Sequence, residues 1–576
     1  MGHDYTYVLP YLLSGYFWFQ LNGLWDIPWF TPAFCGGIPY FPHPTTPYYS
    51  VPQFLTFVLS PVAAVQATML VFAALGYAGF YVLMRRTFST GMWAALLGAT
   101  LFMFNGFYAH RMLIGHLDRH AFMLAPIVAF LLLSASGKET ASRRGAHLLP
   151  IVAAGCLFAY MFQSGLVHVI PVVATAVIAM AVMLAWAKDW PAAAWANFGL
   201  RFAGAAAVAL ALSATKLTAG LYYLQQFPRD FYPLPGLDGF WETIRVAFLS
   251  LFIGPPVDPA WAWPPNWIGL GRHEFEYGVT FVPLELIVFW AVLAAPGWWR
   301  TRGSLVLARR RLWLIAGLLA LLALPLLLNW YSPWWHATLK ELPFFRNSST
   351  LIRWYALFIP LAILGAAIAL DRLVQLGRFQ SWIAVGGMVA VVVLNGAADR
   401  RYYADQPFSP AAIQDAHEKV RTGLMTPRID HIADLVDEQG RRRGVNKGND
   451  ALAWGGSQMY CYEGMFGYRL EAFPFASLHP GPVDEVRGGT LNIKNPACFI
   501  YPAANDCRPG DHYPAARRNE AEAFTGYRPI PFAMPFTQRV ANWINLAAVG
   551  GVPIMLVLGG WFAATGRRRA KEVGDA

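Results

Sequence analysis

The sequence predicts an all-α polytopic membrane protein that carries one mixed α/β domain before its last membrane span. Of its 576 residues, 56% are hydrophobic and only 13% are charged, whereas soluble domains carry about 25% charged residues. The apolar residues come in blocks of about 17–24, long enough to cross roughly 30 Å of hydrocarbon as helices. Basic residues cluster in short loops between these blocks, as the positive-inside rule describes for cytoplasmic loops.

The apolar blocks predict about eleven membrane-spanning helices. The predicted spans are 61–84, 91–108, 120–136, 148–163, 168–187, 199–222, 278–297, 311–329, 353–370, 381–397 and 541–563. Residues 61–397 would then form the transmembrane bundle, and residues 541–576 would form the final span with a basic tail. The ends of such spans are defined to about 2–4 residues.

The basic residues of alternate loops all favour the same orientation. If residues 1–60 lie outside, the inside loops hold Arg85, Arg86, Lys138, Arg143, Arg144, Lys188, Arg300, Arg302, Arg309, Arg310, Arg372, Arg378 and the Arg567-Arg568-Arg569 triplet. The rule therefore predicts a cytoplasmic C-terminus and outer positions for 223–277, 330–352 and 398–540. These loops also account for much of the net charge of +11. A positive net charge can also indicate a nucleic-acid partner, but no segment resembles a nucleic-acid module. The predicted partner is therefore the lipid bilayer.

Residues 1–60 are expected to form an outer loop with a helix on the membrane surface. The stretch 5–20 is apolar but rich in Tyr, Trp and Phe, which favour the membrane–water interface. An alternative makes 5–21 the first crossing. In the preferred interpretation Asp4 is the first outer residue, and we expect one further helix to precede it, which would give twelve spans.

The segment 398–540 is rich in charged and turn-forming residues and predicts an outer domain. Within it, 409–424 predicts a helix, and 490–502 predicts a strand followed by a turn. An oxidising outer compartment permits disulfides. Cys498 and Cys507 enclose eight turn-rich residues, which favours a bridge between them. A Cys35–Cys461 bridge is a weaker alternative.

Four polar segments fall on the predicted outer side, where ionisable groups near a bilayer need a reason. The first holds the N-terminal carboxylate Asp4, the second is 104–120, the third is 229–245 together with 271–278, and the fourth is 339–355. The candidate site residues in them are Asp4, Arg111, His116, Asp118, Glu274, Glu341, Arg346 and Arg353. Each also has a structural interpretation that the sequence leaves open, as a polar chain end, a helix cap or a headgroup anchor.

These residue types suit a transfer reaction with a lipid phosphate. A carboxylate such as Asp4 can act as general base toward a hydroxyl. His116 and Asp118 can orient that hydroxyl, or hold a divalent cation such as Mg²⁺ or Mn²⁺. Arginines can grip a phosphate with a bidentate fork. We therefore assign Asp4, His116 and Asp118 to catalysis and the five other candidates to substrate binding.

Four stretches carry a resemblance to a known family. The N-terminal "DYTYVLPYLLSGYFWFQLNGLWDIPWFTPAFCGGIPYFPHPTTPYYSVPQFL", followed by "FNGFYAHRMLIGHLDRHAFMLAPIVAFLLL", resembles bacterial integral membrane glycosyltransferases of the GT-C superfamily, in particular the YfhO-like branch. "ELPFFRNSSTLIRWY" and "EFEYGVTFVPLEL" are similar to later segments of that group. The resemblance covers roughly residues 4–370 and only loosely the outer domain.

The resemblance implies a GT-C-like fold and a sugar transfer from a polyprenyl-phosphate donor to a glycan, lipid or protein acceptor. The reaction would take place at the outer face of the bacterial inner membrane, with 398–540 in the periplasm. Asp4 would be the acid of the first outer loop, and His116 or Asp118 that of the second. The second loop has "GHLD" in place of an acidic pair, which leaves the metal requirement open.

Two other functions remain alternatives. One is a transporter or flippase for a lipid-linked saccharide, and the other is a non-catalytic envelope assembly protein built around 398–540. Carriers tend to show two related halves with broken helices that meet near the midplane. This chain shows no such similarity between its halves, and the charges of the candidate site lie in outer loops rather than mid-span.

Overall fold

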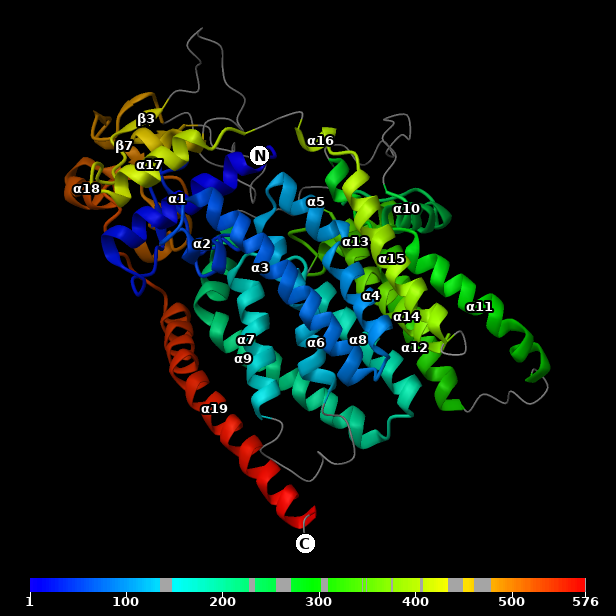
Figure 1. Cartoon of the computed structure of the whole chain (residues 1–576). Coiled ribbons are helices and arrows are strands. Elements are labelled where there is room, and N and C mark those ends of the chain that lie inside the picture. Colours follow the sequence, from blue (N-terminus) through cyan, green and yellow to red (C-terminus); the bar gives the residue numbers. More distant parts are fainter. Residues whose placement is uncertain are drawn as a thin grey trace.

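The computed structural model describes residues 1–134, 148–226, 234–254, 271–301, 309–343, 345–348, 350–373, 377–404, 408–433, 449–459 and 478–574. Helices dominate the described chain and form an elongated bundle with a small α/β layer at one end (Figure 1). The bundle helices are α3 (Pro61–Val82), α4 (Met92–Met103), α5 (Gly106–Ile114), α6 (Ala125–Leu133), α7 (Leu148–Gln163), α8 (Ile170–Lys188), α9 (Ala192–Gln226), α10 (Phe240–Phe252), α11 (Val282–Thr301), α12 (Arg309–Asn329), α13 (Pro333–Glu341), α14 (Phe358–Arg372), α15 (Arg378–Ala397) and α19 (Phe536–Gly574).

Eight helices in the described part of the chain are long and apolar enough to cross a membrane. They match eight of the predicted spans. The remaining three predictions, 120–136, 148–163 and 278–297, fall on α6, α7 and α11, which are not among the eight. The first of these begins as a 3-10 helix, Leu117–Leu124, and only its second half is α6. The chain is therefore a mostly helical protein with the apolar helices of a membrane protein.

Helices α15 and α19 show which surface of the bundle is apolar. Only 11% of the apolar window of α15 and 6% of that of α19 is buried against protein. Their outward side chains are large and apolar, as Trp382, Val393, Trp543 and Val557 illustrate. Extended exposed apolar surface of this kind suits contact with lipid.

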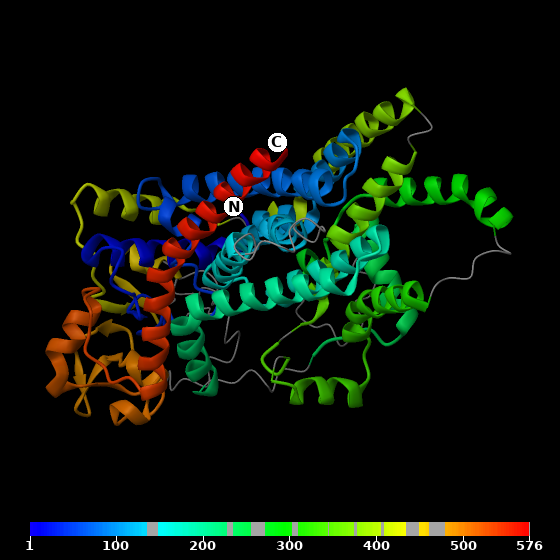
Figure 2. The same cartoon turned by 90° about the horizontal axis from the view of Figure 1, so that it is seen from below.

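Residues 1–60 and the described parts of 398–535 lie together at one end of the bundle, which we call the domain end (Figure 1). Its elements are α1 (Tyr5–Asn22), α2 (Val51–Leu55), α16 (Arg401–Ala404), α17 (Ala411–Arg421), α18 (Arg518–Thr525), β1 (Phe30–Thr31), β2 (Ile38–Pro39), β3 (His431–Ala433), β4 (Gly456–Gln458), β5 (Gly481–Pro482), β6 (Val486–Arg487), β7 (Thr490–Lys494) and β8 (His512–Pro514). The C-terminus lies at the opposite end (Figure 1). Viewed from below, this layer covers one side of the bundle, and α11 projects on the other (Figure 2).

The strands form three small sheets. β1 and β2 are an antiparallel pair, with Phe30 opposite Pro39. β3 lies between β4, which is parallel to it, and β5, which is antiparallel. β7 lies between β6 and β8 in an antiparallel sheet. The predicted helix at 409–424 is confirmed as α17, and the predicted strand and turn at 490–502 are confirmed as β7 and a 3-10 turn at Pro496–Phe499.

The N-terminal segment and the later domain fold as one layer. Helix α1 packs against α17, α2 and α3, and it is not among the eight candidate spans. The amide of Gly36 donates to Ser457 Oγ at 3.1 Å, and its carbonyl accepts from the amide of Lys494 at 2.8 Å. Gly36 has a φ of 67°, and a Cβ there would lie 2.9 Å from Leu478, so glycine is required at this junction.

The cysteines agree with an oxidising compartment at this end. Cys498 and Cys507 form the predicted disulfide, with their Cα atoms 5.8 Å apart. Cys35 is also disulfide-bonded. Cys461, its predicted partner, lies outside the described residues. Cys156, in α7, is free.

Candidate active site

The N-terminus is anchored to the end of helix α5. The amide of Asp4 donates to the carbonyl of Ile114 at 3.0 Å, and the hydroxyl of Tyr5 donates to the carbonyl of Met112 at 2.6 Å. Gly115 ends α5 with a φ of 122°, and a Cβ there would lie 2.6 Å from the amide nitrogen of Tyr5. Glycine therefore both ends the helix and lets the N-terminal chain approach it. This contact brings Asp4 beside His116.

Asp4 and His116 form a hydrogen-bonded pair. His116 Nε2 lies 2.8 Å from Asp4 Oδ2, and His3 Nε2 lies 3.3 Å from Asp4 Oδ1. Arg111 approaches His116 Nδ1 with its NH1 group at 3.3 Å. Since a guanidinium can only donate, Nδ1 is the acceptor and the ring proton lies on Nε2, facing Asp4. Burial alone would raise the pKa of Asp4, but the hydrogen bond from His116 helps to hold it below its usual value, so Asp4 is a carboxylate.

Glu274 joins two arginines from distant parts of the chain. Its Oε2 accepts from Arg111 NH2 at 2.9 Å, and its Oε1 accepts from Arg353 NH2 at 2.7 Å. A further contact of 3.3 Å joins Arg353 Nε to Oε2. Burial alone would raise the pKa of Glu274, but the two guanidinium groups hold it well below its usual range. The three groups carry one net positive charge inside the protein, and each depends on the others for compensation.

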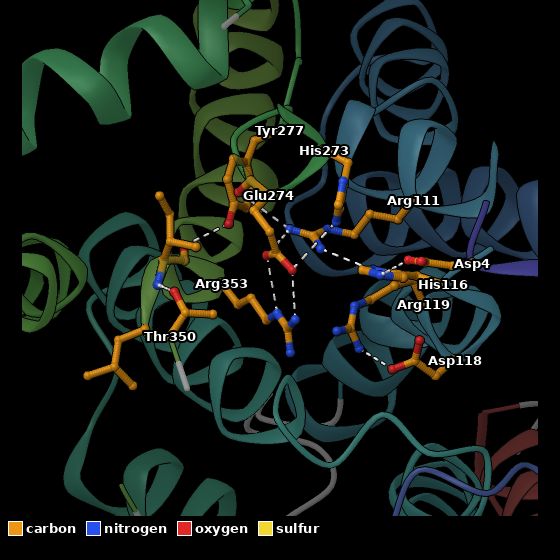
Figure 3. Close-up of polar contacts among 12 residues, drawn as sticks. Asp4, Arg111, His116, Asp118, Arg119, His273, Glu274, Tyr277, Thr350 and Arg353 are labelled. Carbon is orange, nitrogen blue, oxygen red and sulfur yellow. Dashed lines mark hydrogen bonds and ion pairs between the residues drawn. The ribbon is translucent and has the colours of Figure 1, made fainter. Parts of the chain in front are cut away.

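Asp118 and Arg119 form an ion pair beside this network (Figure 3). Burial lowers the pKa of Arg119 to about 10, while Asp118 raises it, so the guanidinium stays charged at neutral pH. Its Nε is buried and has no hydrogen-bond partner among the described residues. The pair therefore adds a third guanidinium, beside Arg111 and Arg353, and a third carboxylate to this group of residues.

The structure brings together most of the residues that the sequence proposed. Asp4, His116, Arg111, Glu274 and Arg353 form one connected chain of polar contacts (Figure 3). They come from the N-terminus, the α5 region, the segment before α11 and the segment before α14. Segments distant in the sequence thus meet near the domain end of the bundle.

Glu341 and Arg346 do not belong to this chain of contacts as far as the described interactions show. Both side chains are exposed, and they lie at the end of α13 and in the turn after it. Lys340 holds that turn by donating to the carbonyls of Arg346 at 2.9 Å and Ser348 at 2.8 Å. Their assignment to substrate binding stays a prediction.

Asp4, His116 and His273 could hold a metal ion, because one ligand atom from each lies within 4.8 Å of the others. Burial lowers the pKa of His273 to about 3, which keeps its ring neutral, as a ligand requires. Two imidazoles and one carboxylate suit Mn²⁺ or a later transition metal better than Mg²⁺, which prefers oxygen. The Arg111 contact opposes binding, because an ion on His116 Nε2 would move the ring proton to Nδ1, next to the guanidinium.

A cavity of about 230 Å³, which we call the first cavity, opens beside Arg353. Its walls are mostly apolar, with Phe162, Leu217, Leu221, Leu224 and Trp354 among the lining residues. Lys216, from α9, also lines it and is 2% exposed. Its Nζ donates to the carbonyls of Thr46 at 2.6 Å and Gln163 at 3.2 Å.

The charge of the first cavity has one sign. Lys216 and Arg353 line it, and none of its described lining residues is Asp or Glu. A buried cation among apolar groups is unfavourable unless it has a partner or a function. The first cavity therefore has the chemistry of a site for an anion with an apolar tail.

Sequence reasoning missed Lys216 and His273. Lys216 is a cation deep within the apolar block 199–222, whose other cation, Arg201, lies near its start, and ionisable residues inside membrane helices often mark functional sites. His273 directly precedes Glu274, and nothing in its sequence neighbourhood shows that it faces His116 with ring centroids 4.9 Å apart. Comparison of the chain with models of protein families, with curated proteins and with solved structures finds no match.

Proposed function

We propose that this protein is a membrane glycosyltransferase of the GT-C type, which moves a sugar from a polyprenyl-phosphate-linked donor to a glycan, lipid or protein acceptor. One observation carries the proposal. A carboxylate–histidine pair is connected through Arg111 and Glu274 to Arg353, which lines an apolar cavity that holds a second cation. A general base and an anion site of this kind are what such a transfer requires.

The donor would bind in the first cavity. Lys216 and Arg353 would contact its phosphate by charge-assisted hydrogen bonds, and the apolar walls would accept the first isoprene units. Arg353 is 19% exposed in its side chain, which leaves part of the guanidinium accessible while Glu274 fixes its orientation. The phosphate would thereby lie near, but not on, the Asp4–His116 pair.

Asp4 would be the base. It takes the proton from the acceptor hydroxyl as that oxygen bonds to the anomeric carbon of the sugar. The bond from this carbon to the phosphate oxygen breaks, and the electron pair leaves with polyprenyl phosphate. Lys216 and Arg353 would stabilise the added negative charge. His116 would orient Asp4 through its Nε2 proton, and Asp118 with Arg119 would position the sugar.

We place the reaction at the outer face of the bacterial inner membrane, with the C-terminus in the cytoplasm. The support is the charge of the alternate loops and the disulfide at the domain end. The same proposal makes 398–540 a periplasmic segment.

A carrier for a lipid-linked saccharide is the second candidate, because the first cavity could bind such a lipid without breaking it. The deciding experiment uses the purified full chain in phospholipid nanodiscs with a radiolabelled polyprenyl-phosphate sugar. A transferase releases free polyprenyl phosphate in step with sugar transfer to an added cell-envelope lipid extract. Binding without release, together with movement of the lipid across a vesicle membrane, would favour the carrier.

Replacement of Lys216 by Met is expected to weaken donor binding by about tenfold, because one charge-assisted contact is lost. The fold should keep or gain stability, since a buried charge is removed. Lys494→Met is the matched control: Lys494 is also buried and donates to a carbonyl, that of Gly510, at 2.8 Å, but it lies in the outer layer. If the Lys216→Met and Lys494→Met variants bind the donor with equal affinity, Lys216 does not contribute to the donor site.

Chelation gives a separate prediction. We expect sugar transfer to persist in EDTA, because the contact between Arg111 and His116 opposes an ion on Nε2. Loss of transfer in EDTA and its recovery with Mn²⁺ would show that Asp4, His116 and His273 act as metal ligands instead. Recovery with Mg²⁺ alone would point to oxygen ligands and away from this group.

A further inference from the structure

A second cavity, of about 420 Å³, lies on the other side of the segment that carries Glu274. Glu274 faces Arg111 and Arg353, whereas Glu276, two residues later, lines the second cavity. None of the steps proposed for sugar transfer involves this cavity. Its lining combines ionisable side chains with a large apolar surface.

The polar wall is built around Glu276. Its Oε1 accepts from Arg272 Nε at 2.7 Å, and its Oε2 lies 3.4 Å from His110 Nδ1. The hydroxyl of Tyr403 also donates to it. Arg272 NH1 lies 3.6 Å from Asp399 Oδ2, so one arginine lies between two carboxylates. The opposite wall is apolar and consists of Phe252, Ile253, Phe281 and Leu394.

Thr280, which lines the same cavity, has a strained backbone and a buried hydroxyl without a partner among the described residues. Its φ is 63°, a conformation that is a genuine outlier for a β-branched residue and that gathers at functional sites. Its Oγ1 is buried without a partner among the described residues, and His110 Nδ1 likewise makes no well-formed hydrogen bond there. Buried polar atoms are normally satisfied, so two such atoms in one cavity indicate a ligand that satisfies them.

The charges decide which ligand fits. Glu276 and Asp399 would repel a phosphate, and Arg272 would repel a cation. A hydroxyl group avoids both penalties, because it can donate to His110 or Glu276 and accept from Thr280 or Arg272. The apolar wall requires that the ligand also carry a hydrocarbon part. The first cavity, with two cations and no described acid in its lining, has the opposite preference.

We propose that the second cavity binds a neutral, hydroxyl-bearing amphiphile of the glycolipid class, and that this amphiphile is the sugar acceptor. Its role as acceptor rests on the proposed function. A short path of contacts runs from the cavity toward the base: Tyr403, whose hydroxyl donates to Glu276, packs edge-to-face against Tyr402 with ring centroids 5.1 Å apart. Tyr402 also lies 3.1 Å from His273 Nδ1. The chain thus has separate sites for an anionic donor lipid and a neutral acceptor lipid.

The test measures lipid binding without donor. The full chain in phosphatidylcholine nanodiscs is titrated with monoglucosyl-diacylglycerol or with phosphatidylglycerol, and bound lipid is counted by native mass spectrometry. The titration is made at about pH 9, because burial raises the pKa of Glu276 to about 7 and its carboxylate is charged above that value. We expect the glycolipid to bind at least about fivefold more tightly than the anionic lipid.

Thr280→Val keeps the shape of the side chain and removes only the hydroxyl, so it should weaken glycolipid binding by about fivefold. Thr280→Gly should weaken it equally while raising the thermal midpoint, since glycine accepts the positive φ. If Thr280 had a purely structural role, Thr280→Gly would not combine weaker glycolipid binding with a higher thermal midpoint. Thr175→Val, in α8, is the control and should change nothing. Glu276→Gln should increase binding of phosphatidylglycerol.

Equal binding of both lipids together with unchanged binding in Thr280→Val and Thr280→Gly would overturn the proposal. Loss of glycolipid binding in Lys216→Met alone would also overturn it, because the glycolipid would then occupy the first cavity. Intact, Thr280-dependent binding without any sugar transfer would contradict the proposed function but keep the second cavity as a glycolipid site. If sugar is transferred to a soluble acceptor and no glycolipid binds, the second cavity is not the acceptor site, but the proposed glycosyltransferase function stands.

Discussion

Asp4→Asn is expected to lower the rate of sugar transfer by about 10²–10⁴-fold, the contribution typical of a positioned general base. Asparagine has the same shape and can accept the Nε2 proton of His116, but it cannot take a proton from the acceptor. Donor affinity should stay within about twofold, because the donor site lies at Lys216 and Arg353. The measurement is kcat and KM for release of polyprenyl phosphate.

The pH profile gives an independent check on Asp4. The pKa of Asp4 lies below its usual 3.8 in the folded protein, so Asp4 is deprotonated at neutral pH and loses its function as a base only below that value. An acid limb near pH 6 would therefore belong to another group. Asp26→Asn, an exposed aspartate of the same N-terminal segment, is the matched control and should keep the rate. Full activity of Asp4→Asn would show that Asp4 is not the base.

Glu274→Ala is expected to destabilise the protein by about 3–5 kcal/mol, the range seen when one member of a buried ion pair is removed. The side chain of Arg111 is 0% exposed, so its charge would be left inside the protein without Glu274. Arg353 would lose both of its contacts with the same carboxylate. Thermal or denaturant unfolding of the detergent-purified chain measures the effect.

Glu242 supplies the matched control for Glu274. It forms an ion pair with Arg245, three residues later, and the two side chains are 35% and 49% exposed. Exposed pairs of this kind contribute up to about 1 kcal/mol, so Glu242→Ala should be nearly neutral. If both alanine variants lose the same stability, the buried cluster does not hold the segment before α11 to the bundle.

The helices of the bundle were largely predictable because hydrophobic blocks of sufficient length leave few alternatives in a bilayer. The prediction for 120–136 was less accurate. The polar residues Asp118, Arg119 and His120 lie in a 3-10 helix, Leu117–Leu124, that is mostly buried against the bundle. Hydropathy does not register such a segment, because Asp118 pairs with the adjacent Arg119 and His120 lies 2.7 Å from the Tyr160 hydroxyl, so protein groups replace part of the water that these side chains would otherwise need.

The candidate site was predictable in its residue types but not in its connections. Asp4, His116, Glu274 and Arg353 were proposed because each is ionisable and lies in a loop that the charge rule places on the outer side. Arg346 has the same properties in sequence, yet its side chain is exposed, whereas Glu274 is buried between two arginines. Only the fold separates these cases, since it decides which loops approach each other.

Sequence by itself determined that this chain is a helical protein built for a membrane and that its ionisable groups gather in particular loops. Both conclusions follow from the local cost of placing polar or apolar groups in hydrocarbon. The tertiary structure alone decided that Glu274 pairs with Arg111 and Arg353 whereas Glu276, two residues later, lines the second cavity. It also decided that Lys216 lines the first cavity and Thr280 the second. Those assignments depend on backbone direction and on contacts between distant segments, which no local pattern records.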